Sequence, residues 1–298
     1  MQIDVSIIGA GSLGTALAYA LNDAGISVNE IVTRRPNKRL LHLAKNVGAD
    51  LVSLKEARLQ SRVLWISTPD SAVAETAATV ANRTTLRRQI VLHSSGVLSS
   101  NALQPAREAG AATASAHPMM SFPQPAAVSL RGVTWAVEGD ASATRTIREM
   151  IRQLGGTSLK LRPTSKPLYH AFASLSSPML VSLLTAAQSA GRSSGLNQRE
   201  VLALMRPIVE RTVANFFENG AAASFSGPFE RGDVKTVALH LEALRSMPAV
   251  EAVYKTAALH ALAALPVKNR ETIRTLLQSA KLPASNPRRR ASAKSVRN

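Results

Sequence analysis

Residues 5–14 read VSIIGAGSLG, and this stretch decides the fold of the first half of the chain. Three of its first four residues are apolar and β-branched, which predicts a short buried strand, and the alanine-rich residues after Gly14 favour a helix. Between them stands a G-x-G-x-x-G motif made by Gly9, Gly11 and Gly14. The motif therefore occurs in the order of strand, tight turn and helix start in which it has a physical meaning.

Each glycine of the motif has its own role. Gly9 permits a sharp turn, Gly11 lets a diphosphate approach the backbone, and Gly14 lets the helix pack closely on the sheet. The N–H groups of Ser12 and Leu13, at the electropositive helix start, would then face the phosphates. We interpret the motif as a dinucleotide site. A glycine-rich turn without a ligand is the structural alternative.

The first half of the chain alternates apolar runs typical of strands with stretches typical of helices. The expected strands lie near residues 3–8, 28–33, 62–67, 89–93, 112–116, 133–137 and 158–162. This alternation predicts an α/β fold, an N-terminal Rossmann-type parallel sheet with helices on both faces.

After Pro163 the strand pattern stops. The expected helices lie near residues 166–191, 198–219, 234–246, 249–264 and 269–280. The second begins with a capping box, Asn197 with Glu200. We therefore expect three segments: a dinucleotide-binding Rossmann-like domain at 1–163, an all-α substrate and dimerisation domain at 164–281, and a disordered basic tail at 282–298.

The net charge of +17 is partly local, because the last 18 residues hold six basic residues and no acidic one. A basic segment could bind polyanions non-specifically. It has no aromatic residue to stack on bases, so we expect a solvated tail and no specific nucleic-acid partner. A nucleic-acid-associated protein that uses this tail is a less favoured hypothesis.

The longest uncharged stretch runs from Pro167 to Gly191 and contains Ser, Thr, Gln and Pro178. This composition favours a buried helix over a membrane span. The chain has no cysteine, which excludes thiol nucleophiles and thiolate metal sites, and no signal peptide is expected before the first strand. We expect a cytoplasmic protein without a membrane partner.

Arg34 and Arg35 follow the second expected strand, where dinucleotide folds that prefer NAD carry an acidic residue. An acid would repel the 2′-phosphate of NADP, whereas an arginine can bind it bidentately. We therefore predict NADP, with NAD less favoured. The alternative is that both are surface arginines of a basic protein.

The strand near residues 62–67 ends at Ser67, and Pro69 and Asp70 follow. Ligands of this fold lie outside the carboxyl ends of the strands, so we place these residues beside the cofactor. Asp70 could equally cap the next helix.

Two further strands each end in a histidine, His93 followed by Ser94 and Ser95, and His117. Histidine changes protonation near neutral pH, which suits proton transfer. We predict that His93 and Ser94 contact the cofactor, Ser95 the substrate, and that His117 is catalytic. For each histidine the alternative is a ring whose nitrogens are satisfied by loop backbone.

Lys166 and His170 stand at the expected domain junction, four residues apart, so a helix there would place both on one face. Either could give a proton to the product or stabilise an alkoxide. We predict both as catalytic, with a solvated helix-start lysine as the alternative.

A loop with two glycines and a proline interrupts the helical half and contains Arg231 and Asp233. Arg231 could clamp an anionic group of a small-molecule substrate, and Asp233 is a good cap for the next helix. His240 lies two helical turns further on the same face. We assign these three residues to the substrate, although the loop residues could be purely structural. The six histidines have no metal-site spacing, so no metal is predicted.

Taken together, these motifs resemble a bacterial family of Rossmann-like oxidoreductases with a C-terminal helical domain of unknown function. That family is distantly related to pyrroline-5-carboxylate reductase, deazaflavin-dependent NADP reductases and 6-phosphogluconate dehydrogenase. The resemblance covers residues 3–262. It rests on Gly9 to Gly14, Pro69-Asp70, His93 to Gly96, His117-Pro118 with Phe122, Tyr169-His170, and Gly227-Pro228 through Asp233 with His240.

The resemblance implies an NADP-type cofactor and a homodimer in which the helical domain completes the cleft. It implies no particular substrate. The 3-hydroxyacid dehydrogenase branch pairs its lysine with an asparagine four residues on, where this chain has His170, and Pro178 stands where relatives often carry asparagine. The leading hypothesis is an NADP-dependent oxidoreductase for a small carbonyl or imine, and the alternative is a non-catalytic NADP-binding sensor or partner protein.

Overall fold

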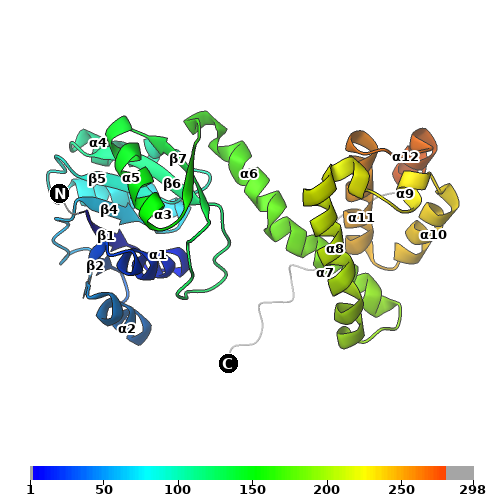
Figure 1. Ribbon diagram of the computed structural model, residues 1–298, viewed down its shortest axis with the longest axis horizontal. Coiled ribbons are helices and arrows are strands. Elements are labelled where there is room, and N and C mark those ends of the chain that lie inside the picture. The colour runs from blue at the N-terminus through cyan, green and yellow to red at the C-terminus, as the bar shows by residue number, and fades with distance from the viewer. Residues whose placement is uncertain (1–2, 280–298) are drawn as a thin grey trace, which may run out of the picture. The chain divides into compact units, whose positions relative to one another are not determined.

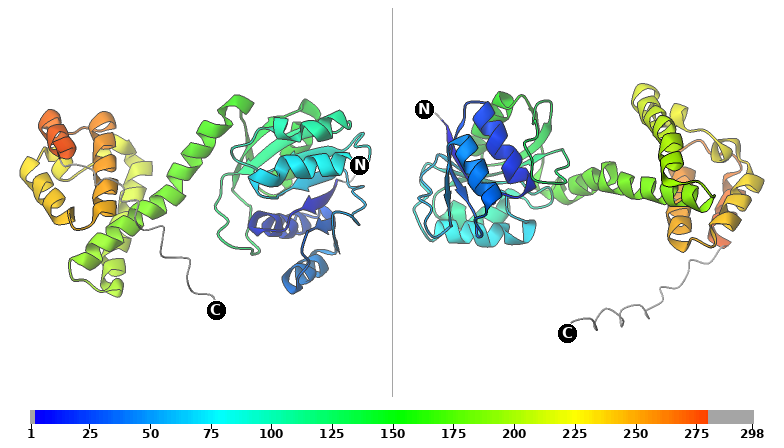
Figure 2. Two further views of the ribbon diagram at one scale, coloured as in Figure 1. Left: turned by 180° about the vertical axis from the view of Figure 1, so that it is seen from behind. Right: turned by 90° about the horizontal axis from the view of Figure 1, so that it is seen from below.

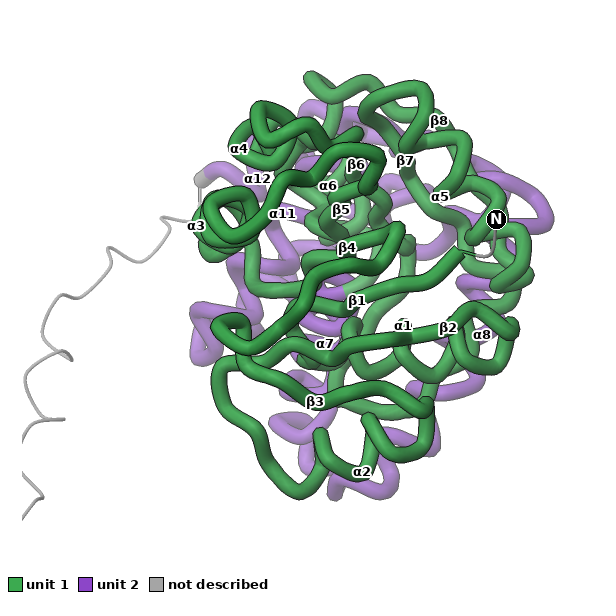
Figure 3. Tube along the Cα trace, turned by 90° about the vertical axis from the view of Figure 1, so that its left-hand side faces the viewer, with its two compact units in different colours: residues 1–177 green, residues 178–298 purple. Residues whose placement is uncertain are grey.

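The computed structural model describes residues 3–279 of the chain. The chain divides into two compact units, residues 1–177 and 178–298, which are green and purple in Figure 3. Each unit encloses its own cluster of buried apolar side chains.

The first unit alternates strands with helices along the chain (Figure 1). Its elements are β1 (Asp4–Ile8), α1 (Ser12–Asp23), β2 (Ser27–Val32), α2 (Lys38–Val47), β3 (Asp50–Val52), β4 (Val63–Ile66), α3 (Asp70–Ala81), β5 (Ile90–His93), the 3₁₀ helix η1 (Ser100–Leu103), α4 (Gln104–Glu108), β6 (Ala112–Pro118), β7 (Thr134–Gly139), α5 (Ala141–Gln153), β8 (Thr157–Lys160), the 3₁₀ helix η2 (Pro163–Ser165) and α6 (Lys166–Ser176). The expected strands are all present. The three-residue strand β3 is an addition, because so short a run carries no readable periodicity.

The strands form one sheet in the order β3-β2-β1-β4-β5-β6-β7-β8. The predicted Rossmann-type sheet is confirmed, since every neighbouring pair but one is parallel. The exception corrects the expectation of a purely parallel sheet, because β7 runs antiparallel to β6. Residues 119–133 between these strands contain no helix. Without a crossover helix the chain turns back beside β6, and the pairing becomes antiparallel.

Helices cover both faces of the sheet, as predicted (Figure 2). One buried cluster packs α1, α2 and α5 on the face that carries Ile7 and Trp65, and the other packs α3 and α4 on the face that carries Ile8 and Ile66. Alternate residues of a strand point to opposite faces, so a strand buried on both must be apolar throughout.

The register of the central strands places the segments that follow β1, β4 and β5 close to one another. Ile8 of β1 pairs with Ile66 of β4, which pairs with His93 of β5. The segments that follow these three residues therefore leave the sheet at the same edge. The glycine motif, the segment after β4 and the serines after β5 all belong to these segments.

The second unit consists of helices in the part that the structure describes, up to residue 279. They are α7 (Pro178–Ser193), α8 (Gln198–Ser224), α9 (Pro228–Arg231), α10 (Val234–Leu244), α11 (Pro248–Ala264) and α12 (Arg270–Ser279). The expected capping box is confirmed: Asn197 Oδ1 accepts from Glu200 N at 3.0 Å, and Glu200 Oε2 accepts from Asn197 N at 2.8 Å. The core is formed by α10, α11 and α12, with Val237, Leu262 and Ile273 fully buried.

Along the chain, the boundary between the two units falls between Ser177 and Pro178. The end of the strand pattern had suggested a boundary at 163/164. Helix α6 does begin at Lys166, but its contacts group it with the α/β unit. The expected helix at 166–191 is split into α6 and α7, because Pro178 lacks a backbone N–H and disfavours helical geometry in the residue before it. The tail at 282–298 lies outside the described residues.

The apolar segment Pro163–Ser193 is helical but is not buried as expected. The segment is long enough to cross a membrane, and its most apolar 18-residue window has a mean hydropathy of 1.3 and no buried residue. Within one chain, apolar side chains such as Met179 and Val181 of α7 stay exposed.

Candidate functional site

The glycine motif forms a tight turn between β1 and α1. Gly9 has a φ of 101°, which a residue with a Cβ rarely adopts, and Ser67 Oγ donates to its carbonyl oxygen at 2.5 Å. A Cβ on Gly14 would overlap that same carbonyl oxygen and crowd Ser67 Oγ. The first and last glycines therefore fix the close packing of α1 on β1 and on the end of β4.

Gly11 stands in a different environment. A Cβ there would meet no atom within 4 Å, so this glycine has open space in front of it. Gly11 is the N-cap of α1, and neither a side-chain cap nor an acidic residue occupies the first turn. The free N–H groups and positive dipole of α1 are thus unopposed at this end, which suits an anion.

A cavity of about 820 Å³ opens in front of this helix end. Of the predicted residues, it is lined by Gly9, Gly11, Ser12, Leu13, Arg34, Arg35, Ser67, Pro69, Asp70, Ser94 and Ser95. Asp70 is the first residue of α3 and makes no side-chain cap, so its carboxylate stays exposed on the cavity wall. Sequence reasoning missed Thr68, whose hydroxyl is buried in the wall and has no hydrogen-bond partner among the described residues.

A third arginine near the cavity also escaped the sequence analysis. Arg39 of α2 donates to Thr15 Oγ1 at 2.8 Å and to the carbonyl oxygen of Ala10 at 2.9 Å. It therefore ties α2 to the glycine turn. Arg34 and Arg35 line the cavity and are exposed, so part of its rim is basic. Only the fold reveals Arg39, since a lone basic residue near a helix start is common.

His93 ends β5 but does not line the cavity. It is fully buried, its Nδ1 accepts from Ser95 N at 3.1 Å, and its Nε2 donates to the Ser99 carbonyl oxygen at 3.0 Å. Burial lowers the pKa of His93 to about 4, so the ring is neutral near pH 7. Both ring nitrogens of His93 are therefore hydrogen-bonded to backbone atoms, which was the alternative to a cofactor contact in the sequence analysis.

Lys166, the first residue of α6, is also fully buried. Its ammonium donates to the carbonyl oxygen of Ser95 and to Ser115 Oγ, both at 2.6 Å. Burial lowers the pKa of Lys166 to about 8, against the opposing attraction of Glu138 and Asp70. The lysine is thus not in solvent, and it links α6 to the ends of β5 and β6.

His117, Tyr169 and His170 lie together next to Gly96. His117 Nδ1 is hydrogen-bonded to the Tyr169 hydroxyl at 2.9 Å, and the His117 and His170 rings lie edge to face with centroids 6.1 Å apart. A Cβ on Gly96 would collide with the His170 ring and lie 3.0 Å from His117 Nε2. Burial, with the charge of Lys166, lowers the pKa of His117 to about 4, and burial raises that of Tyr169 to about 12.

The structure therefore brings the three predicted catalytic residues, His117, Lys166 and His170, into one cluster together with Tyr169. Ser95 connects this group to the cavity, because it lines the cavity while its carbonyl oxygen holds Lys166. The residue following Ser95, Gly96, contacts both histidines. Polar groups that can move a proton thus lie directly beside a cavity fitted to an anion.

Arg231, Asp233 and His240 lie in the second unit. Asp233 caps α10 by accepting from Thr236 N at 3.1 Å and from Thr236 Oγ1 at 2.6 Å, and these bonds lower its pKa. His240 Nδ1 is hydrogen-bonded to the Tyr254 hydroxyl at 2.9 Å, beside an apolar cavity of about 310 Å³. The cap is confirmed. The assignment of these residues to a substrate stays a prediction.

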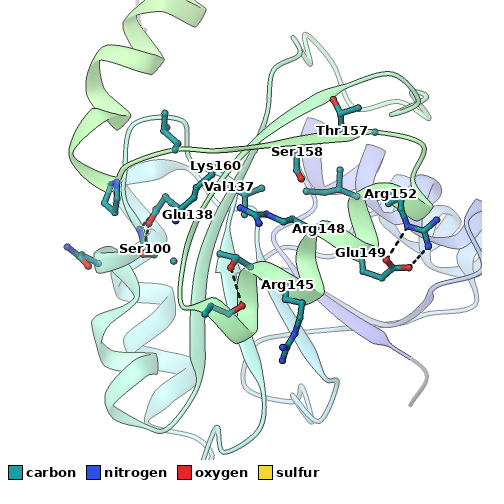
Figure 4. A pocket seen from close by; sticks show the side chains of 18 of the residues that line it. Ser100, Val137, Glu138, Arg145, Arg148, Glu149, Arg152, Thr157, Ser158 and Lys160 are labelled. Carbon is teal, nitrogen blue, oxygen red and sulfur yellow. Dashed lines mark hydrogen bonds and ion pairs between the residues drawn. The ribbon is translucent and has the colours of Figure 1, made fainter.

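A second cavity of the first unit, about 1220 Å³, lies along β7, β8 and α5 (Figure 4). Its charged groups are partly paired: Arg152 donates to Glu149 at 2.6 Å, and Glu138 accepts from Ser100 Oγ at 2.8 Å. No residue predicted to carry function lines this cavity. Its size alone does not make it a site.

Two family matches agree with this architecture. Residues 1–118 match the family described as a Rossmann-like domain, and residues 133–261 match a domain of unknown function, DUF2520. The chain thus combines a Rossmann-like domain with a DUF2520 domain, and the resemblance inferred from its motifs is confirmed. The DUF2520 match begins just before β7, inside the first unit.

Similar solved structures share the fold. A provisionally assigned NADP oxidoreductase from Bacteroides fragilis is 19% identical with a TM-score of 0.74, over 87% of this chain and 97% of that one. A reductive aminase from Aspergillus terreus, in complex with NADPH, is 17% identical with a TM-score of 0.65, over 92% and 99%. At such identities the likeness shows the fold alone.

One sequence relative matches a short part of the chain. The ketol-acid reductoisomerase (NADP(+)) of Bifidobacterium animalis subsp. lactis strain AD011 is 41% identical over 66 residues, which are 22% of this chain. The match spans 18% of that protein, so the chain corresponds to less than a fifth of its length.

Proposed function

We propose that this protein is an oxidoreductase that binds a nicotinamide dinucleotide, NADP(H) in preference to NAD(H), and reduces or oxidises a small carbonyl or imine compound. The observation that carries the proposal is the cavity of about 820 Å³ at the uncapped start of α1. The similar proteins, an NADP oxidoreductase, a reductive aminase in complex with NADPH and a ketol-acid reductoisomerase (NADP(+)), support it.

The residues of the cavity fit such a cofactor. The open space at Gly11 and the N–H groups of Ser12 and Leu13 would hold the diphosphate. Arg34 and Arg35 on the rim would bind a 2′-phosphate. The remaining predicted contacts are Ser67, Pro69, Asp70 and Ser94 on the cavity wall.

When bound, the nicotinamide supplies or accepts the hydride, and the chain supplies orientation and proton transfer. Ser95, at the junction of the cavity and the proton-transferring group, would contact the substrate. His117, Lys166 and His170 are the sequence-predicted candidates for handling its proton. For Arg231, Asp233 and His240, which lie in the second unit, we propose a role in binding the substrate.

We also propose a homodimer formed through the helical unit. Large apolar side chains of α7 and α8 are exposed in one chain, among them Val181, Ile208 and Phe217. Exposed apolar surface of this extent is typical of a protein interface. A sedimentation measurement giving a monomer at micromolar concentration would contradict this. A cytoplasmic location stays a prediction.

Fluorescence titration of the full-length protein with NADPH and NADH tests the cofactor assignment. We expect NADPH to bind more tightly than NADH. The double variant Arg34→Ala/Arg35→Ala should weaken NADPH binding by about 10- to 100-fold, the effect of losing a charge-assisted contact, and leave NADH almost unaffected. The matched control is Arg145→Ala/Arg148→Ala on exposed positions of α5.

The titration also separates the alternatives. Failure of the wild type to bind either nucleotide would contradict the proposal. Binding of NADPH without turnover of any compound in a panel of keto acids, ketones and imines would favour the non-catalytic NADP-binding sensor.

A further inference from the structure

Resting on the proposed function, we propose that the substrate is a carbonyl compound and not an iminium ion, that Tyr169 gives the proton to its oxygen, and that Lys166 is a positioning residue whose charge favours the developing oxyanion. The proposal follows from which groups of the cluster are accessible and which charges face them.

Lys166 cannot reach a substrate. Its side chain is fully buried, and its ammonium is bonded to the Ser95 carbonyl oxygen and Ser115 Oγ. These bonds hold the first turn of α6 against the loop after β5. What a buried ammonium can still do is act through its field, which is strong where water is excluded.

That field reaches the neighbouring group. Lys166 Nζ bonds at 2.6 Å to Oγ of Ser115, which stands two residues before His117 on β6. Burial is the main cause of the lowered pKa of His117; the charge of Lys166 lowers it further, and the charge of Asp70 acts in the opposite direction. His117 is consequently neutral near pH 7. The Tyr169 hydroxyl, with its raised pKa, also stays protonated there.

Tyr169 is the accessible acid of the cluster. It is only partly buried and lies one turn along α6 from Lys166. Its hydroxyl is bonded to His117 Nδ1 at 2.9 Å, and the two rings are perpendicular with centroids 5.5 Å apart. The contact fixes the position of the hydroxyl without giving it a charge.

No carboxylate among the described residues bonds to Lys166, His117 or Tyr169. The two carboxylates that act on Lys166 do so without a bond to it: Glu138 accepts from Ser100 N at 2.7 Å and from Ser100 Oγ at 2.8 Å, and Asp70 is exposed at the start of α3. Lys166 is therefore the charged group that is bonded within the cluster, and neither carboxylate is bonded to the Tyr169 hydroxyl. An iminium cation would be repelled here, whereas negative charge growing on a carbonyl oxygen would be stabilised.

The proposed reduction balances with these groups. The carbonyl carbon gains a hydride from the reduced nicotinamide, which is thereby oxidised. The electron pair of the C=O π bond moves onto oxygen, and this oxygen takes the proton of the Tyr169 hydroxyl. Tyr169 regains a proton from solvent by way of His117, so one hydride and one proton are consumed for each alcohol formed.

The test compares a ketone with an imine of the same ring size. Full-length protein and NADPH are assayed with cyclohexanone and with 2,3,4,5-tetrahydropyridine, and with pyruvate and its N-methylimine. We expect the carbonyl member of a pair to be reduced at least about tenfold faster, the difference made by about 1.4 kcal/mol. Activity on the carbonyl should fall as pH rises through about 8, where Lys166 loses its charge.

Two variants assign the roles. Tyr169→Phe should lower kcat on the carbonyl by about 10²- to 10⁴-fold, the usual contribution of a general acid, with NADPH affinity unchanged. Lys166→Met should remove the pH inflexion near 8 and reduce the preference for the carbonyl, whereas Lys166→Arg, which keeps the charge, should retain part of that preference. If Lys166→Met fails to fold, the wild-type pH profile still decides.

A second readout does not depend on turnover. The ionisation of 4-nitrophenol, bound to the protein loaded with NADP⁺, is followed by its absorbance. We expect its pKa to drop by about one unit, a tenfold preference for the anion. Ser142→Ala, at an exposed position of α5, is the control and should leave this pKa unchanged.

Faster reduction of the imines, a bound nitrophenol that ionises less readily than free nitrophenol, or full activity of Tyr169→Phe would overturn the inference. So would a protein that binds NADPH but neither reduces a carbonyl nor binds nitrophenol, and the cofactor proposal would survive that result. Failure to bind NADPH would instead remove the proposed function itself.

Discussion

The glycine turn and the cluster around Lys166 occupy adjoining parts of the same unit, yet they are held in different ways. The turn is fixed by the backbone: Gly9, Gly14 and the end of β4 pack so closely that a single Cβ would not fit. The cluster is fixed by side chains from elements far apart in the sequence, with Lys166 and Tyr169 on α6 bonded to residues of β6 and of the loop after β5. A local sequence motif can therefore predict the glycine turn but not the cluster around Lys166.

The largest expected effect contrasts two glycines of the turn. Gly14→Ala should lower the free energy of unfolding by about 3 kcal/mol, because its Cβ would overlap the Gly9 carbonyl oxygen. Gly11→Ala should leave stability within about 1 kcal/mol but weaken NADPH binding about tenfold or more, because its Cβ would enter the space for the diphosphate. Urea unfolding and NADPH titration measure the two quantities. Equal free energies of unfolding for the two variants would contradict the different roles assigned to Gly11 and Gly14.

This contrast explains how much of the fold could be predicted. The alternation of strands and helices, the motif at residues 9–14 and the caps at Asn197 and Asp233 are local patterns, and the structure confirms them. The antiparallel β7 was not predicted, because its direction depends on a helix being absent from residues 119–133. The strand β3 was too short to see.

The candidate site was harder to predict in detail. His93 and His117 look alike in the sequence, each at the end of an apolar strand, but one has both ring nitrogens bonded to backbone and the other is bonded to Tyr169. The burial of Lys166 also has no local signal, because a lysine at a helix start is normally solvated. Which polar group is accessible is decided by packing between distant elements.

The next prediction concerns the free energy of unfolding at low pH and the contribution of His93 to it. The pKa of His93 is about 4 when folded and about 6.5 when unfolded, so the unfolded chain binds more protons between these values. Stability is fully present above pH 6.5 and is lost as pH falls towards 4, by about 3 kcal/mol for this residue. Urea unfolding of the wild type and of His93→Gln from pH 7 to 4 measures it. An equally steep decline in the variant would show that His93 is not the cause.

The smallest expected effect comes from one bond within the cluster. Ser115→Ala removes one of the two acceptors of the Lys166 ammonium and should lower the free energy of unfolding by about 1–2 kcal/mol. Ser142→Ala, at an exposed position of α5, is the control and should change stability by less than about 0.5 kcal/mol. If the two variants are equally stable, the buried lysine does not depend on Ser115.

The central claim is that the uncapped start of α1 holds the diphosphate of a nicotinamide dinucleotide. A crystal structure of the full-length protein grown with NADP⁺ tests it most directly. We expect the diphosphate against the N–H groups of Ser12 and Leu13, in front of Gly11, and the nicotinamide ring next to Ser95. A dinucleotide bound elsewhere, with this helix start left to solvent, would contradict the account.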